Sequence, residues 1–127
     1  MFITILKSNK ANDSWIIEFS CSYGNGIGCW IGSPPSCGEG YWVEFDVEER
    51  LQLGVNLSCC DTPFPSISSE GAVQTLVATV EQVNENSTAV CRFGNDLLFV
   101  EYDGKFPEVG DWLSIRVRHL IVNDCNF

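Results

Sequence analysis

Apolar and polar residues alternate with a period of two through much of this chain, and this alternation restricts its fold more than any other feature. It is clearest at Trp42–Val47, at Leu51–Leu57 and along Val73–Tyr102. Successive side chains of a β-strand point to opposite faces, so this is the period of a strand with one buried face. The i, i+3, i+4, i+7 spacing of an amphipathic helix is not well developed in any stretch between the glycine and proline residues. The sequence therefore predicts an all-β protein with little or no helix.

The first half of the chain predicts strands separated by long loops. Short β-rich runs at Phe2–Leu6 and Trp15–Phe19 predict an N-terminal hairpin. Glycine and proline are so frequent in Tyr23–Gly40 that we expect a long loop there with one short strand. The alternation at Leu51–Leu57 predicts a further strand, and the prolines after Cys60 predict a second loop that extends to Gly71.

The second half predicts a meander of consecutive hairpins. Its expected strands are Val73–Val83, Thr88–Phe93, Asp96–Tyr102 and Trp112–Val122, and Gly94-Asn95 fits a two-residue type II′ turn. About eight short strands with no alternating helices indicate an antiparallel sandwich or small barrel. We expect one β domain over residues 1–127.

One segment resembles a known barrel family. Val77–Val122, with Gly110-Asp111-Trp112-Leu113 at the start of a strand, resembles the later strands of the OB-fold, a small Greek-key barrel. The resemblance implies a shape. It implies no binding residue, because nucleic-acid binding in that family depends on a basic groove lined with aromatics.

The charge of the chain is strongly negative and unevenly distributed. The formal net charge is −10, and no basic residue occurs between Lys10 and Arg50. Seven carboxylates lie in that interval: Asp13, Glu18, Glu39, Glu44, Asp46, Glu48 and Glu49. Such a field repels phosphate backbones and anionic lipid, so neither nucleic acid nor membrane is an expected partner. A cationic partner is expected instead.

The apolar runs predict a cytoplasmic protein. Leu97–Val100 and Leu120–Val122 are far shorter than the roughly 20 residues of a membrane-spanning helix. Met1–Leu6 is apolar, but Lys7 and Lys10 follow it instead of preceding it, which is not the pattern of a signal peptide.

The seven cysteines are expected to be mostly reduced and to bind no metal. Their number is odd, and their spacing lacks the close C-x2-C pairs that are typical of zinc ligands. The neighbouring Cys59 and Cys60 would point to opposite faces of a strand. Cys91, in a β-rich stretch, is interpreted as a small buried apolar residue.

No catalytic or cofactor-binding pattern is recognisable. His119 is the single histidine, and the alternation from Leu113 places it on the apolar face of a strand. The glycines of Gly24–Gly28 lack the lysine of a phosphate-binding loop. The sequence therefore predicts a protein that is not an enzyme and needs no cofactor.

In size, acidity and lack of catalytic motifs, the chain resembles the bacterial immunity proteins that neutralise polymorphic or contact-dependent toxins. The resemblance implies binding to a cationic toxin domain, such as a nuclease. We expect carboxylates to accelerate association and aromatic side chains to anchor the complex. The candidate partner-binding residues are Trp30, Glu39, Tyr41, Trp42, Glu44, Asp46, Glu48 and Glu49. Two alternatives remain: an OB-like protein-binding accessory module, and a β-barrel that binds or converts a small molecule.

Overall fold

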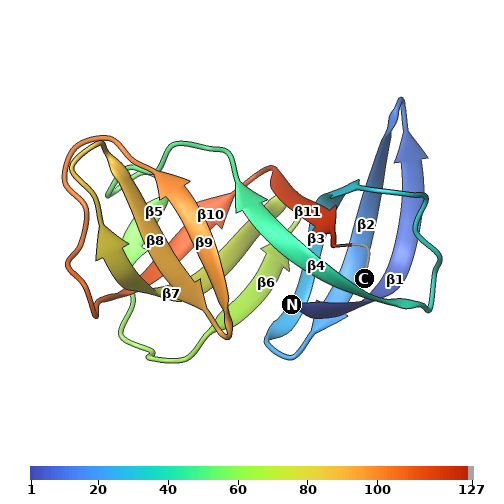
Figure 1. The fold of residues 1–127 in the computed structure, drawn as a ribbon, viewed down its shortest axis with the longest axis horizontal. Coiled ribbons are helices and arrows are strands. Elements are labelled where there is room, and N and C mark those ends of the chain that lie inside the picture. Colours follow the sequence, from blue (N-terminus) through green and yellow to red (C-terminus); the bar gives the residue numbers. More distant parts are fainter. Residues whose placement is uncertain (126–127) are drawn as a thin grey trace.

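The chain folds entirely into strands and the turns between them (Figure 1). The computed structural model describes residues 1–125, and none of these residues is helical. Within this range the strands are β1 (Phe2–Ala11), β2 (Ser14–Cys21), β3 (Gly24–Ile31), β4 (Gly40–Val47), β5 (Leu57–Cys59), β6 (Ser66–Glu70), β7 (Val73–Val83), β8 (Thr88–Phe93), β9 (Asp96–Glu101), β10 (Trp112–Val117) and β11 (Leu120–Asp124). The all-β prediction is confirmed.

Five strands close into a barrel, on the right of Figure 1. The ring runs β1–β2–β3–β11–β4 and returns to β1. All of its pairings are antiparallel except β3–β11, which is parallel. A five-stranded Greek-key barrel is also the architecture of the OB-fold. The sequence places the OB-like part at residues 77–122, however, and of that segment only the start of β11 enters the ring.

The strands between β4 and β11 form a second lobe around the long strand β7. Thr79 of β7 pairs with Arg92 of β8 on one edge and with Trp112 of β10 on the other. β6 pairs with the first half of β7, on the same edge as β8, and β5 extends the sheet beyond β10. The predicted strands Val73–Val83 and Thr88–Phe93 are confirmed at both ends. Gly94 has a φ of 62°, as the first turn residue of a type II′ hairpin requires.

One continuous hydrophobic core joins the barrel to the second lobe. A chain of aromatic rings crosses the junction: Phe19 of β2 stacks on Phe45 of β4 at 5.5 Å, and Phe45 meets Phe93 of β8 at 6.1 Å. Tyr23 then packs edge-on against Phe93 at 5.4 Å. The two lobes thus share their largest buried side chains, so neither has an independent core at this point.

The prediction for Tyr23–Gly40, a long loop with one short strand, is correct in expecting one strand but underestimates its length. Gly24–Ile31 is an eight-residue strand that pairs with β2, β11 and β6. A Cβ atom on Gly26 would lie 2.6 Å from the Phe19 ring, and one on Gly28 would lie 2.6 Å from Val122. Gly26 and Gly28 therefore let the neighbouring side chains pack directly on the backbone of β3. Glycine in a strand can thus mark close packing as well as a loop or bulge.

Three further strand predictions need correction. Leu51–Leu57 is mostly a turn, and the isolated bridges Leu51–Tyr102 and Leu53–Leu57 replace a regular strand. The predicted loop after Cys60 contains β6, which pairs with β7. The expected strand Trp112–Val122 is broken at Arg118-His119, where the chain leaves the second lobe and enters the barrel.

The seven cysteines are free thiols in very different environments. Cys91 is completely buried, as the sequence predicts, and burial raises the pKa of its thiol to about 12. Cys37 and Cys59 are exposed.

At pH 8 we expect a maleimide to label Cys37 and Cys59 quickly in the native protein and to label Cys91 only after unfolding. The thiolate is the reactive species, and burial suppresses it. Peptide mass mapping after timed labelling measures the labelling rate of each cysteine, and labelling in denaturant is the control. Equal native rates at Cys91 and Cys37 would contradict the buried position of Cys91.

Candidate functional site

The outward face of β4 carries a row of acidic residues. Val43, Phe45 and Val47 point into the core, which leaves the alternate residues Trp42, Glu44 and Asp46 exposed. Glu48, directly after the strand, is exposed as well. The period of two therefore brings four of the predicted site residues, Trp42, Glu44, Asp46 and Glu48, to one face.

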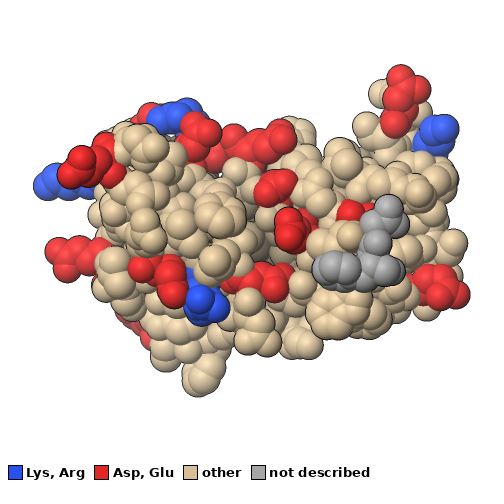
Figure 2. Space-filling view, in the orientation of Figure 1, with Lys and Arg blue, Asp and Glu red and all other residues tan. Residues whose placement is uncertain are grey.

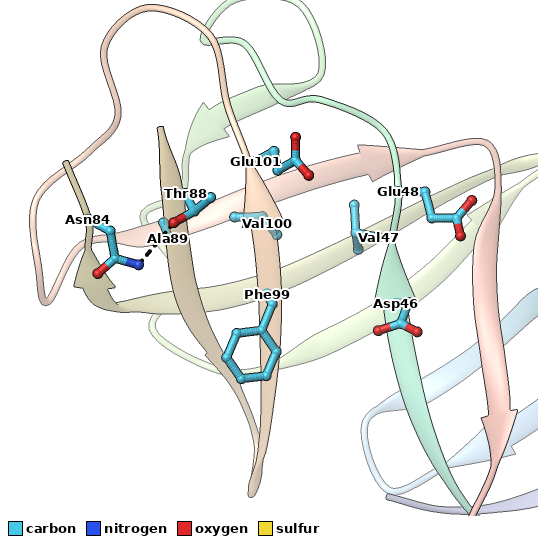
Figure 3. A pocket seen from close by; sticks show the side chains of 9 residues that line it. All are labelled: Asp46, Val47, Glu48, Asn84, Thr88, Ala89, Phe99, Val100 and Glu101. Carbon is cyan, nitrogen blue, oxygen red and sulfur yellow. Dashed lines mark hydrogen bonds between the residues drawn. The ribbon is translucent and has the colours of Figure 1, made fainter. Parts of the chain in front are cut away.

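A groove separates β4 from β9 of the second lobe. Its wider part has a volume of about 450 Å³, and the β4 and β9 residues of its lining include Asp46, Glu48, Phe99 and Glu101 (Figure 3). A narrower part of about 300 Å³ continues from Asp46 and Phe99 to Glu44 and Asp96. We call these two parts together the β4–β9 groove. It lies where the barrel meets the second lobe.

The β4–β9 groove has an excess of negative charge. Glu101 is paired with Arg50 at 2.6 Å, and Asp96 with the amino group of Met1 at 2.7 Å. Among residues 1–125, Glu44 and Glu48 form no ion pair. Asp46 accepts a hydrogen bond from the neutral Asn123 amide at 2.6 Å. Figure 2 shows carboxylates along the middle of this face. The unpaired carboxylates of β4 therefore dominate the field in the groove.

Exposed aromatic rings accompany these carboxylates. Phe99 of β9 is 66 % exposed and lines both parts of the groove. Beyond the narrower part, Trp42 is 54 % exposed, and its ring meets that of Phe2 edge-on at 5.4 Å. Large exposed aromatic rings are more frequent at protein-binding surfaces than on the rest of a protein surface.

Two predicted aromatic residues lie away from this surface. Trp30 is only 3 % exposed, and its indole Nε1 donates a hydrogen bond to the carbonyl of Ser33 at 2.7 Å. Tyr41 is half-buried against Trp30, and its hydroxyl accepts a hydrogen bond from the Ser36 amide at 2.9 Å. Trp30 is therefore a core residue, and Tyr41 holds the segment that precedes β4.

Two predicted carboxylates also lie outside the groove. Glu39 is exposed before β4, where its backbone carbonyl accepts a hydrogen bond from the Ile5 amide. The Glu49 carboxylate accepts hydrogen bonds from the amides of Arg118 and His119. Glu49 thus holds the turn between β10 and β11 and has a structural role.

Replacing Glu49 with alanine is expected to cost about 1 to 2 kcal/mol in the free energy of unfolding, because two turn amides lose a charged acceptor. Glu48→Ala is the matched control and should stay within about 0.5 kcal/mol of the original protein. Urea unfolding of both variants measures the difference. Equal stability of the two variants would show that the turn does not depend on the Glu49 carboxylate.

The sequence interpretation missed the β9 side of the groove. The sequence predicts a strand at Asp96–Tyr102, but all of the candidate partner-binding residues, aromatic and acidic, precede Arg50. The available signal was the outward row Leu97, Phe99, Glu101, which places an aromatic ring on the solvent side of a strand.

Within residues 1–125, the single histidine and the potential metal ligands are not gathered into one cluster. His119 is exposed in the turn before β11, so its predicted place on an apolar strand face is wrong. No group of three or more histidine, cysteine, aspartate or glutamate side chains within residues 1–125 is arranged to hold a metal ion. In the same range no helix has the length and apolar character of a membrane span.

Comparison with protein-family models, with curated proteins and with solved structures finds no match to this chain.

Proposed function

We propose that this protein binds and neutralises a cationic protein domain, in the manner of an immunity protein that inhibits a toxin. The observation that carries the proposal is the β4–β9 groove, where Glu44, Asp46 and Glu48 on the β4 side lie across from the exposed ring of Phe99 on β9. A nuclease presents lysine and arginine side chains to its phosphate substrate, and these are the groups that such a groove complements.

In this mechanism the carboxylates and the aromatic rings act at different stages of binding. The carboxylates of β4 attract the partner over a distance of about one Debye length and so raise the association rate. Phe99 and Trp42 then bury their exposed rings against the partner, which slows dissociation. Cations that are held in the groove no longer reach a phosphate substrate, so binding and inhibition coincide.

The proposed function predicts an adjacent reading frame whose product ends in a basic toxin domain, and the test is protection of cells that express that domain. The groove variant carries Glu44→Lys, Asp46→Lys and Glu48→Lys. The matched control carries Asp13→Lys, Asp61→Lys and Glu70→Lys, which are exposed, line no part of the groove and change the net charge equally. We expect the groove variant to lose protection and to associate at least about tenfold more slowly, with a flatter salt dependence. Equal protection by the two variants would overturn the acidic-groove mechanism.

The closed five-stranded barrel favours a second candidate, an OB-like accessory module that binds protein. In that case the acidic residues serve mainly solubility. The groove variant would then bind its partner as fast as the control variant does.

A further inference from the structure

The edge of β9 that faces the groove has open backbone hydrogen-bonding groups. β9 pairs with β8 on its other edge, and Tyr102 just beyond it donates its amide to the Ser87 carbonyl on that side. The carbonyl of Glu101 points the opposite way and accepts the amide of Leu51 at 2.9 Å. Alternate residues of a strand direct their N–H and C=O groups to the same edge. Leu97 and Phe99 therefore direct theirs into the groove, where no described residue pairs with them.

The facing edge of β4 is open in the same way. Val43 exchanges two hydrogen bonds with Met1, at 2.8 and 3.0 Å, so its backbone groups point away from β11. By the same alternation, the backbone N–H and C=O groups of Phe45 and Val47 point to the edge of β4 that is opposite β11. The β1–β4 pairing ends at Trp42, so β1 does not cover this edge at Phe45 and Val47. No strand pairing joins β4 and β9 within residues 1–125. Two open strand edges therefore border one groove.

The side chains on these strands define what a further strand along β9 would meet. Leu98 and Val100 of β9 and Phe45 and Val47 of β4 point inward and are buried. The outward row bears carboxylates: Glu101 on β9 and Glu44, Asp46 and Glu48 on β4. An added strand would place alternate side chains against the apolar lining of the groove, which includes Val47, Ala89 and Val100, and between the outer carboxylates.

We propose that the partner inserts an extended segment of alternating basic and apolar residues, which adds to the open edge of β9 as a further strand. This inference rests on the proposed function and specifies how the partner is recognised. Strand addition gains affinity from backbone hydrogen bonds and specificity from alternate side chains. A second copy of this chain is a poor occupant, because it would bring the unpaired carboxylates Glu44 and Glu48 of two grooves close to one another.

Backbone variants of β9 separate strand addition from side-chain contact. Leu97→Ala removes the side chain and keeps the outward N–H, whereas Leu97→Pro removes both. Proline is tolerated on an edge strand whose N–H faces solvent, and a thermal melt confirms that both variants fold. We expect Leu97→Pro to bind at least about tenfold more weakly than Leu97→Ala, the loss expected for one hydrogen bond in a dry interface.

Hydrogen exchange of the original protein provides a direct readout that needs no variant. The probe is the peptide acetyl-(Lys-Val)5-amide, and acetyl-(Glu-Val)5-amide is the charge control. In the free protein, the amides of Leu97 and Phe99 should exchange rapidly, whereas those of Leu98 and Val100 should be protected by β8. With saturating basic peptide, we expect exchange at Leu97 and Phe99 to slow at least about tenfold, and the acidic peptide should have no effect.

The outcomes distinguish this inference from the function on which it rests. Absence of basic-peptide binding, or binding without slower exchange at Leu97 and Phe99, would overturn strand addition. Equal partner affinity of Leu97→Pro and Leu97→Ala would also overturn strand addition. This holds even if the groove variant loses protection, because that loss concerns only the charges of the groove. Equal protection by the groove and control variants would instead overturn the acidic-groove function.

Discussion

Replacing Phe93 with alanine is expected to lower the free energy of unfolding by about 3 to 5 kcal/mol. Phe93 is completely buried and contacts Phe45 of the barrel and Tyr23 in the turn before β3. Its removal leaves a cavity at the junction of the two lobes, where rigid strands on both sides cannot collapse to fill it. Urea unfolding followed by tryptophan fluorescence and circular dichroism measures the loss.

Phe99→Ala is the matched control for this substitution. It removes the same ring from the neighbouring strand, where Phe99 is 66 % exposed, and should change stability by less than about 0.5 kcal/mol. Both variants should unfold in one transition that is common to both probes, as expected of one domain with a shared core. Equal destabilisation by the two substitutions would contradict the assignment of Phe93 to the core and Phe99 to the surface.

Replacing Gly24 with alanine is expected to destabilise the protein by about 3 kcal/mol or more. Gly24 pairs with Ile67 where the barrel joins the second lobe, and its φ of 134° is one that other residues rarely adopt. A Cβ atom at this position would lie 2.1 Å from the Ile67 carbonyl oxygen. This contact involves backbone on both sides, so a rotamer change cannot relieve it.

Gly104→Ala is the control that separates the cost of a positive φ from the cost of the clash with Ile67. Gly104 also has a positive φ, of 73°, but a Cβ atom there would meet nothing within 4 Å. This control should therefore show only the conformational cost of about 1 kcal/mol. Thermal and urea unfolding measure both variants. A Gly24→Ala protein as stable as Gly104→Ala would mean that the two lobes do not approach each other closely at this point.

The strands that could be predicted from the sequence are those in which pattern and turn chemistry agree. Val73–Val83 and Thr88–Phe93 are rich in β-branched and other apolar residues, and Gly94-Asn95 supplies the turn that such strands need. In Gly24–Ile31, the small residues at Gly26 and Gly28 hid the buried face of the strand. The spacing of these glycines itself has a period of two, which is a signal that a search for apolar side chains misses.

The candidate site could be predicted on one side only. Glu44, Asp46 and Glu48 share a face because they alternate within one strand, and local sequence is sufficient to show this. Phe99 is about fifty residues further along the chain, and the fold of the second lobe brings it opposite β4. Similarly, Trp30 and Glu49 owe their structural roles to contacts with Ser33 and with the Arg118-His119 turn, which composition does not reveal.

The position of β11 has a consequence for the order of folding. This strand lies between β3 and β4 in the ring, although the whole second lobe separates it from β4 in the sequence. Closing the barrel therefore requires a long loop to close first, and such steps are slow. The β7–β8–β9 meander consists of local hairpins and is expected to form earlier. During synthesis, the β3 and β4 edges stay unpaired until the ribosome has released Leu120–Asp124, so the nascent chain is most prone to aggregation in this interval.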